Sequence, residues 1–122
     1  MAKTIMVVDD SASLRQVVGI ALKSAGYDVI EATDGQNALF KLGAQKINLI
    51  VCDVNMPHMD GITFVRELKQ LANHKFTPVI MLTTESQEAK KKEGQAAGAK
   101  AWVVKPFKPE VLLGAVQKLV LP

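Results

Sequence analysis

The sequence predicts an α/β fold in which one doubly wound parallel sheet carries helices on both faces. Five short apolar runs rich in β-branched residues alternate with segments of helical periodicity along the 122 residues. Such alternation favours right-handed crossovers, which set successive strands parallel and cover both faces of the sheet. The chain has the length of one domain and contains no internal repeat or Pro/Gly/Ser-rich linker, so a single domain is expected over residues 1–122.

The expected strands are the apolar runs themselves. They cover residues 4–8, 27–32, 49–52, 79–82 and 101–104.

Three of the intervening segments repeat apolar residues at helical spacing, and each therefore predicts an amphipathic helix. The three apolar faces are Leu14, Val17, Val18, Ala21 and Leu22; Phe64, Val65, Leu68, Leu71 and Ala72; and Leu112, Leu113, Val116, Leu119 and Val120.

Residues that cap helices support these boundaries. Gly26 suits a helix C-terminus, Asp34 and Asp60 suit helix N-caps, and Pro109 suits a first helical turn. Segment 86–98 has few apolar residues, three consecutive lysines and a glycine, so a lightly packed and mobile helix is expected there.

Composition narrows the classes of function. The net charge is only +3, and the one dense run of lysines, residues 90–92, lacks interleaved aromatics, so a solvated helix face is expected and no nucleic-acid partner. The apolar start of the chain is too short for a signal peptide or a membrane span, so a cytoplasmic location is expected. The single cysteine, Cys52, is expected to be buried and inert, and His58 and His74 to be exposed.

Polar residues follow four of the five expected strands. They are Asp9 and Asp10 after the first strand, Asp53 after the third, Thr83 and Thr84 after the fourth, and Lys105 after the fifth. The carboxyl ends of parallel strands share one edge of the sheet, where ligands of such folds bind, so these side chains should meet there.

Three carboxylates gathered at one edge repel one another. At about 5 Å and an effective dielectric near 20, each pair costs roughly 3 kcal/mol. A divalent cation relieves this repulsion, and Mg²⁺ is expected because it prefers oxygen ligands and bridges carboxylates to phosphate. Lys105 would add a positive charge for carboxylate or phosphoryl oxygens. An alternative is that Asp9 and Asp10 merely cap the first helix.

Four segments together resemble the response-regulator receiver family, and the short single-domain form is similar to the CheY-like chemotaxis regulators. The segments are Val7-Val8-Asp9-Asp10-Ser11, the run from Asp53 to Gly61 (DVNMPHMDG), Met81-Leu82-Thr83-Thr84, and Trp102-Val103-Val104-Lys105-Pro106-Phe107. The resemblance covers the chain nearly end to end. It implies a receiver domain with a flavodoxin-like sheet of strand order 2-1-3-4-5.

The resemblance also assigns the site residues. Asp53 would be the phosphoacceptor, while Lys105 and Thr83 would hold phosphoryl oxygens. Asp10 and Asp53 would bind Mg²⁺ through carboxylates, Asn55 through its main-chain carbonyl, and Asp9 largely through water. The Lys105–Pro106 peptide would be cis.

By the same resemblance the protein is a signalling switch rather than an enzyme. A CheA-like histidine kinase, or a small phosphodonor, would supply the phosphoryl group, and a monomeric receiver would then bind a partner such as a flagellar motor switch protein or a phosphatase. Movement of Thr83 toward the phosphate would turn Trp102 inward and alter the surface of the last two helices and the last strand.

Departures from the family pattern leave other interpretations open. Trp102 is bulkier than the tyrosine common in motor-binding chemotaxis regulators, so a phosphate sink or relay intermediate is the alternative function. Thr84 stands where a small residue is frequent and should narrow access to Asp53, and Glu85 and Asn55 should tune loss of the phosphate. Other classes weighed are a hydrolase of the haloacid dehalogenase type, an FMN binder, and an interaction module that is not phosphorylated.

Overall fold

The computed structural model describes residues 2–43, 45–84 and 88–122, in which five strands and five helices alternate along the chain. The strands are β1 (Thr4–Val8), β2 (Asp28–Ala32), β3 (Leu49–Asp53), β4 (Val79–Thr83) and β5 (Ala101–Val104). The helices are α1 (Ala12–Ser24), α2 (Gly35–Leu42), α3 (Gly61–Leu68), α4 (Glu88–Ala97) and α5 (Pro109–Leu119).

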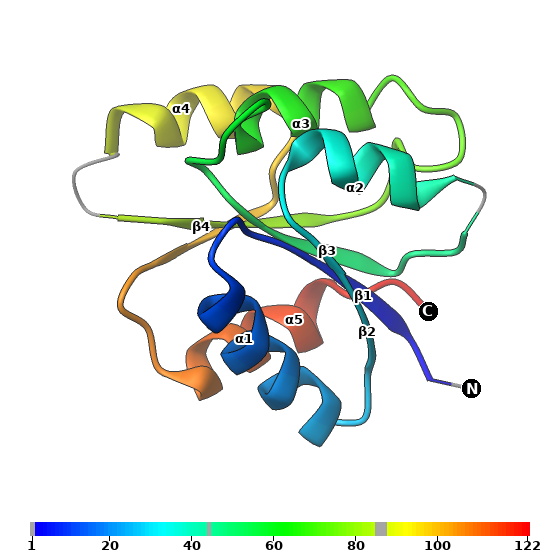
Figure 1. The fold of residues 1–122 in the computed structure, drawn as a ribbon, viewed down its shortest axis with the longest axis vertical. Coiled ribbons are helices and arrows are strands. Elements are labelled where there is room, and N and C mark those ends of the chain that lie inside the picture. The colour runs from blue at the N-terminus through cyan, green and yellow to red at the C-terminus, as the bar shows by residue number, and fades with distance from the viewer. Residues whose placement is uncertain (1, 44, 85–87) are drawn as a thin grey trace.

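All five strands form one parallel sheet with the order β2-β1-β3-β4-β5. Helices α2, α3 and α4 cover one face of this sheet, and α1 and α5 cover the other (Figure 1). The α/β class, the parallel sheet and the strand order implied by the resemblance are therefore confirmed.

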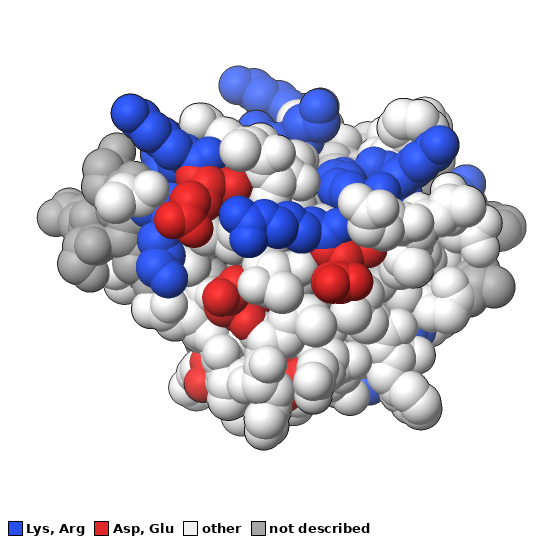
Figure 2. Space-filling view, turned by 90° about the horizontal axis from the view of Figure 1, so that it is seen from above, with Lys and Arg blue, Asp and Glu red and all other residues white. Residues whose placement is uncertain are grey.

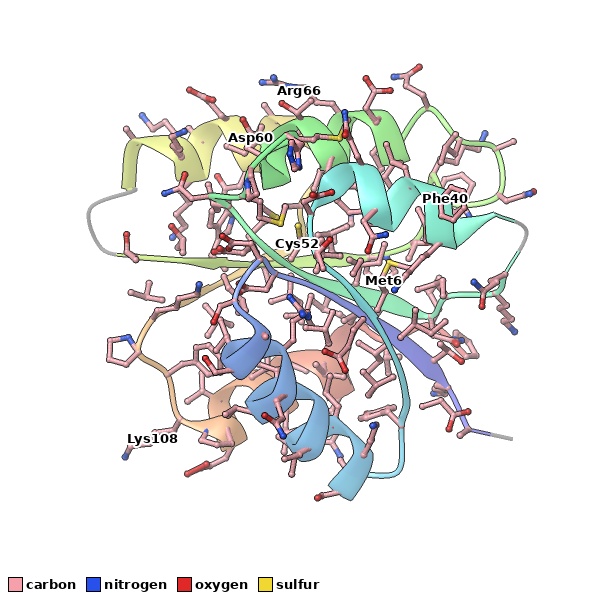
Figure 3. The ribbon with its side chains drawn as sticks, viewed as in Figure 1. Met6, Phe40, Cys52, Asp60, Arg66 and Lys108 are labelled. Atoms are coloured by element: carbon pink, nitrogen blue, oxygen red, sulfur yellow. The ribbon has the colours of Figure 1, made fainter. Side chains whose placement is uncertain are left out.

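The apolar runs are continuous because the central strands are buried on both faces. Alternate residues of β1 enter different cores: Met6 and Val8 pack beneath α2, α3 and α4, and Ile5 and Val7 pack against α1 and α5. Cys52 is fully buried in the first core, which also contains Met6 (both labelled in Figure 3), and burial raises the pKa of its thiol well above the usual value. Its expected burial is confirmed, and a thiol held protonated is chemically inert.

The helix starts follow the expected caps, with one difference. The side chains of Asp34 and Asp60 accept hydrogen bonds from Asn37 N and Thr63 N at the starts of α2 and α3. Helix α1, however, is capped by Ser11, whose Oγ accepts a hydrogen bond of 3.3 Å from Leu14 N. The interpretation in which Asp9 and Asp10 only cap the first helix is therefore wrong.

Helix α3 is shorter than its apolar pattern predicts. It ends at Leu68: Lys69 N still bonds four residues back, but the N–H groups of Gln70 and Leu71 bond only three residues back, which tightens and ends the helix. Leu71 and Ala72 are consequently exposed rather than part of a buried face.

Two other expectations about exposure to solvent are also wrong. Val17 lies at the margin of the apolar face of α1 and is 57% exposed. His74 is buried, not exposed, because its Nε2 lies 3.1 Å from the carbonyl oxygen of Gly43 and joins the α3–β4 loop to the end of α2.

Helix α4 is lightly packed, as its composition predicts. Among its residues with described side chains, Gly94 is the buried one, and residues 86 and 87 of the expected helix lie outside the described part of the chain. Lys92 is exposed, whereas Lys90 and Lys91 are half-buried. Lysine, arginine and acidic side chains are interspersed over the face formed by α2, α3 and α4 (Figure 2).

Both ends of the chain meet at one residue, Asn48, just before β3. Its Oδ1 accepts a hydrogen bond from Thr4 N, and its Nδ2 donates to the carbonyl oxygens of Leu121 and Pro122. The termini therefore lie near each other (Figure 1). None of the described helices combines the length and the apolar character that crossing a membrane requires.

Candidate functional site

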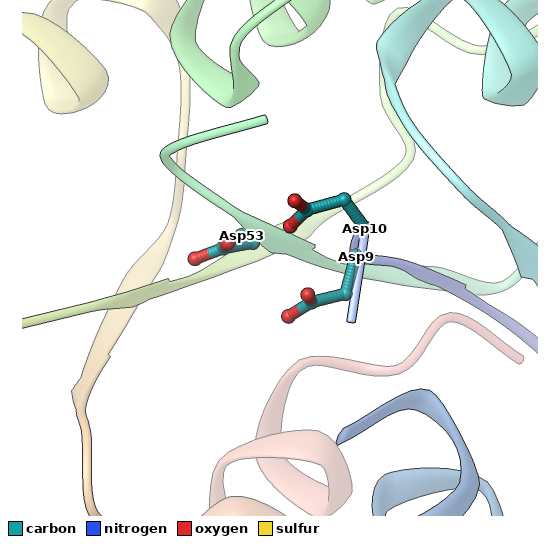
Figure 4. Close-up of side chains that lie close together, drawn as sticks. All are labelled: Asp9, Asp10 and Asp53. Atoms are coloured by element: carbon teal, nitrogen blue, oxygen red, sulfur yellow. The ribbon is translucent and has the colours of Figure 1, made fainter. Parts of the chain in front are cut away.

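The carboxyl ends of β1 and β3 bring three carboxylates together. Asp9 and Asp10 follow the last residue of β1, and Asp53 is the last residue of β3, its neighbour in the sheet. One oxygen from each side chain lies within 4.8 Å of the others. The three carboxylates project to the same side beyond the strand ends (Figure 4). The expected meeting of these residues is confirmed.

Lys105, directly after β5, completes the cluster. Its Nζ lies 3.0 Å from Oδ1 of Asp53 and 3.6 Å from Oδ2 of Asp9. Its main-chain N–H donates to the carbonyl oxygen of Thr83, and the following bond to Pro106 is cis, as the resemblance implies. A strand that is two places away from β3 in the sheet thus supplies the positive charge.

Asp9 is almost fully buried and has spare capacity to accept. Its Oδ1 accepts a hydrogen bond of 2.8 Å from Ser11 N, whereas its buried Oδ2 accepts no hydrogen bond from any residue that the structure describes. Burial is the main effect and raises the pKa of the Asp9 carboxyl, which the Ser11 N–H and Lys105 partly offset. A buried carboxylate oxygen that accepts no hydrogen bond has lone pairs available to ligate a cation.

Asp53 is 8% exposed and accepts two hydrogen bonds on one oxygen. Its Oδ1 accepts from Val54 N at 3.0 Å and from Lys105 Nζ. Burial raises the pKa of the Asp53 carboxyl, Lys105 counteracts this, and the nearby charge of Asp9 raises the pKa further. The carboxylates at the ends of β1 and β3 offer three hard oxygen donors, and those of Asp9 and Asp53 are buried. Such a set of donors fits a divalent metal site.

Two threonines, Thr83 and Thr84, lie at the carboxyl end of β4, next to the end of β3. Thr83 is the last residue of β4, is buried, and donates through Oγ1 to the carbonyl oxygen of Thr84 at 3.2 Å. Thr84 is exposed, and with Lys105 it lines a groove of about 450 Å³ whose other walls are apolar. The groove is formed by Leu14, Val17, Thr84, Lys105, Pro106, Phe107 and Pro109. Glu85, expected to act beside the site, lies outside the described residues.

The chain turns tightly after Asp53. Asn55 is exposed two residues beyond it, and Gly61 N donates to the carbonyl oxygen of Val54 at 2.8 Å. A Cβ atom on Gly61 would collide with the carbonyl oxygen of Asp53, so this return of the backbone requires glycine. His58 in this loop is exposed, as expected.

Trp102 on β5 lies on the same side of the sheet as Thr83. Met81 on β4 pairs with Trp102, and Thr83 is two residues further along the same strand, so the three side chains share one face. The indole is half-buried against Gly94 of α4, where a Cβ atom would overlap the ring, and no described residue hydrogen-bonds to its buried Nε1.

Arg15 is a site neighbour that the motifs did not indicate. Its Nη1 donates to the carbonyl oxygen of Asp9 at 2.6 Å, and its Nε donates to Glu31 at 3.1 Å. It thereby fixes the backbone at the first two carboxylates. An arginine in the first turn of a helix carries no distinctive spacing, so only the fold reveals this contact.

Comparison with known proteins gives a consistent result. The family model of the response regulator receiver domain matches residues 5–117. Protein PilG of Pseudomonas aeruginosa is 39% identical over 113 residues, which are 93% of this chain and 84% of PilG. The chain spans about half the length of several transcriptional regulators that it also matches, such as PhoP of Bacillus subtilis, of which it covers 49%.

Solved structures agree. The chemotaxis protein CheY4 of Vibrio cholerae has a TM-score of 0.93 and 46% identity, with 98% of this chain and 100% of that chain covered. The receiver domain of the sensor histidine kinase PA1611 from Pseudomonas aeruginosa has a TM-score of 0.89 and 28% identity, with 98% of each chain covered, and it has a magnesium ion coordinated in its active-site cleft.

Proposed function

This chain belongs to the response regulator receiver family, and from that premise we propose that it is a phosphorylation-activated switch of a two-component system with Asp53 as phosphoacceptor. The observation that carries the proposal is the position of Asp53. It ends a buried strand, lies 3.0 Å from Lys105 and shares its edge with two further carboxylates. A nucleophile, a cation and a candidate metal site in one place are the components that phosphoryl transfer requires.

We assign Mg²⁺ as the cation. Asp10 and Asp53 would hold it through carboxylates, Asn55 through its carbonyl oxygen, and Asp9 largely through water. Two observations support this assignment: Oδ2 of Asp9 accepts no hydrogen bond from the described residues, and the donor set consists of oxygens only. When bound, Mg²⁺ neutralises negative charge on the carboxylates and on the incoming phosphoryl group.

The transfer step uses the protein's own groups. A carboxylate oxygen of Asp53 attacks the phosphorus of a phosphohistidine in a histidine kinase, the P–N bond breaks, and its electron pair returns to the imidazole nitrogen. Lys105 and Thr83 bind phosphoryl oxygens, because both lie at the strand ends beside Asp53. Lys105 must move its hydrogen bond from the carboxylate to the phosphoryl group as the charge develops there.

The switch couples β4 to β5. We infer that Thr83 moves toward the phosphoryl group and that the space it leaves allows Trp102 to change position on the same face of the sheet. Trp102 is suited to this change, because its buried indole N–H has no acceptor among the described residues and an unpaired buried donor costs about 1–3 kcal/mol. The surface formed by α4, β5 and α5 would then change.

The similarity to CheY4 supports a role in chemotaxis, with a CheA-like kinase as donor and a motor switch protein or a phosphatase as partner. The other candidate, a phosphate sink or relay intermediate, is favoured by Trp102, whose bulk alters the α4–β5 surface. Binding of the phosphorylated chain to a flagellar switch protein would support the first, and return of the phosphoryl group to a histidine protein the second.

The test is to incubate the protein with a phosphohistidine kinase or a small phosphodonor, with and without Mg²⁺, while intact mass and Trp102 fluorescence are followed. We expect Mg²⁺-dependent addition of one phosphoryl group, lost in Asp53→Ala, together with a fluorescence change. Phosphorylation with silent fluorescence would remove Trp102 from the switch. Failure with every donor would support an interaction module that is not phosphorylated.

A further inference from the structure

The loop between Asp53 and α3 carries Asn55 and is closed only at its base. Gly61 N bonds to the carbonyl oxygen of Val54, and inside the loop the main-chain hydrogen bond of the described residues is that from Met59 N to Pro57 O, 2.7 Å. The outer part of the loop must therefore be held by side chains.

His58 makes the first of these side-chain contacts. Its Nδ1 lies 2.9 Å from Oδ2 of Asp34, while Oδ1 of Asp34 accepts a hydrogen bond of 2.8 Å from Asn37 N. The buried carboxylate of Asp34 thus caps α2 with one oxygen and holds the 54–60 loop with the other. His58 has a φ of 66°, in the left-handed region that a histidine adopts only at a cost.

The residues that follow His58 and Asp34 in the chain, Met59 and Gly35, make the second contact. Met59 lies so close to Gly35 that a Cβ atom there would be 2.8 Å from its Cγ and 2.9 Å from its Sδ. Met59 also packs against the core beneath α2 and α3. Two consecutive loop residues therefore contact the N-cap and the first residue of α2, His58 with Asp34 and Met59 with Gly35, and we call this pair of contacts the loop latch.

We propose that His58 is a positioning residue for the divalent cation: through the loop latch it holds the 54–60 loop so that the carbonyl group of Asn55 is already placed beside the carboxylates. This inference rests on the proposed function of the site. A ligand group that is fixed before binding loses less conformational freedom when the cation binds, so the affinity is higher. Groups that orient metal ligands have such effects, commonly tenfold or more in affinity.

The side chain of His58 has little other use. It is 66% exposed, so it buries little surface, and its backbone conformation favours glycine or asparagine. A substitution that relieves the backbone but removes the contact with Asp34 therefore separates positioning from stability.

The experiment is a titration of the ¹⁵N-labelled protein with MgCl₂. Binding is monitored by NMR through the amide signals of Val54 and Asn55. His58→Gly should bind Mg²⁺ about tenfold more weakly although its backbone is relaxed. His58→Asn should restore nearly the wild-type affinity, because asparagine tolerates the left-handed region and its Nδ2 occupies the place of the histidine Nδ1. Neither substitution touches the carboxylates.

The partner residue provides the matched test. Asp34→Ser keeps an N-cap for α2 but lacks the second oxygen, so it should weaken Mg²⁺ binding as His58→Gly does. In the double variant the two losses should not add, because both remove the same contact.

The outcomes separate the latch from the site. If the wild type binds Mg²⁺ and His58→Gly or Asp34→Ser binds equally well, the latch is refuted while the proposed function stands. If His58→Asn is as weak as His58→Gly, side-chain positioning is likewise refuted. If the wild type does not bind Mg²⁺, the metal assignment fails and the latch fails with it. The spectra of the same samples report whether each variant is folded.

Discussion

The ammonium group of Lys105 lies 3.0 Å from Oδ1 of Asp53 and 3.6 Å from Oδ2 of Asp9, so one lysine forms ion pairs with two buried carboxylates. Asp10 adds a third negative charge within 4.8 Å of the other two. Three carboxylates against one ammonium leave the site net negative, and this imbalance determines both its affinity for cations and its effect on stability.

Replacing Lys105 should separate metal binding from transfer. Lys105→Met removes a positive charge beside the carboxylates, so Mg²⁺ should bind about tenfold more tightly, because a unit charge at about 5 Å is worth a few kcal/mol before screening. Phosphorylation of Asp53 should nevertheless slow by roughly a hundredfold, since a donor to the developing charge is lost.

Calorimetric titration with Mg²⁺ and time-resolved intact mass measure the two effects. Lys108→Met is the control, because Lys108 is an exposed lysine just beyond the site. Weaker Mg²⁺ binding in Lys105→Met would show that the lysine organises the carboxylates instead of competing with the cation.

The stability of the metal-free protein should fall with rising pH because of Asp9 and Asp53. Burial raises the pKa of both carboxyls above the 3.8 of a free side chain, so the folded state binds more protons than the unfolded state in this window. Their ionisation costs nothing below pH 3.8 and destabilises the fold increasingly as the pH rises through the raised pKa values.

Asp9→Asn should therefore raise the free energy of unfolding by on the order of 1 kcal/mol at neutral pH in EDTA, and the stability of this variant should depend less on pH. Urea unfolding from about pH 2.5 to pH 7.5, which spans the titration of both carboxyls, measures the difference from the wild type. Asp34→Asn should behave oppositely. The hydrogen bond from Asn37 N and then His58 lower the pKa of Asp34, so its ionisation stabilises the fold above pH 3.8 and this stabilisation is lost as the pH falls. Equal slopes for both variants would contradict the assignment.

Gly94→Ala should destabilise the protein although alanine favours helices. A Cβ atom at Gly94 overlaps the Trp102 ring, and such overpacking costs about 1–3 kcal/mol against a gain of roughly 1 kcal/mol in helix propensity. The fluorescence of Trp102 should shift as the ring moves. Gly114→Ala in α5 is the control, because nothing lies within 4 Å of its Cβ atom, and it should stabilise by about 1 kcal/mol. If both substitutions stabilise the protein, α4 can move away from Trp102 without a loss of stability.

Much of the site was predictable, because parallel topology alone brings strand ends together. Asp9, Asp53 and Lys105 are far apart in the chain, yet each follows an apolar run, and this was sufficient to expect them at one edge. The expected third and fourth strands stopped one residue short of Asp53 and Thr83, because these residues are polar. In the structure the ladder continues to them.

Contacts without a periodic signal were not predictable. The burial of His74 depends on the end of α2, about thirty residues earlier, and Ser11 caps α1 because Asp9 turns toward the sheet edge. The overlap of Gly94 with Trp102 arises only when α4 lies on β5. In each case a tertiary contact outweighs the local pattern.

Thr84→Ala should speed phosphorylation by small donors a few-fold. Thr84 is exposed and lines the groove that also contains Lys105, so a smaller side chain widens the approach to Asp53. The measurement is the initial rate of phosphoryl addition with a small phosphodonor, and the rate with a protein kinase is the comparison. An unchanged or lower rate with the small donor would refute the role of Thr84 in access.

The hydrogen bonds of Asn48 bear on how the molecule can be handled. Because Thr4, Leu121 and Pro122 all bond to this one side chain, the two ends could be joined by a short peptide, and new ends opened in an exposed loop, with little change to the sheet. Asn48 precedes β3, whereas Asp53 ends it, so a dye or a surface tether attached at either end would sit the length of that strand from Asp53. Immobilised protein should therefore remain open to kinase, donor and cation.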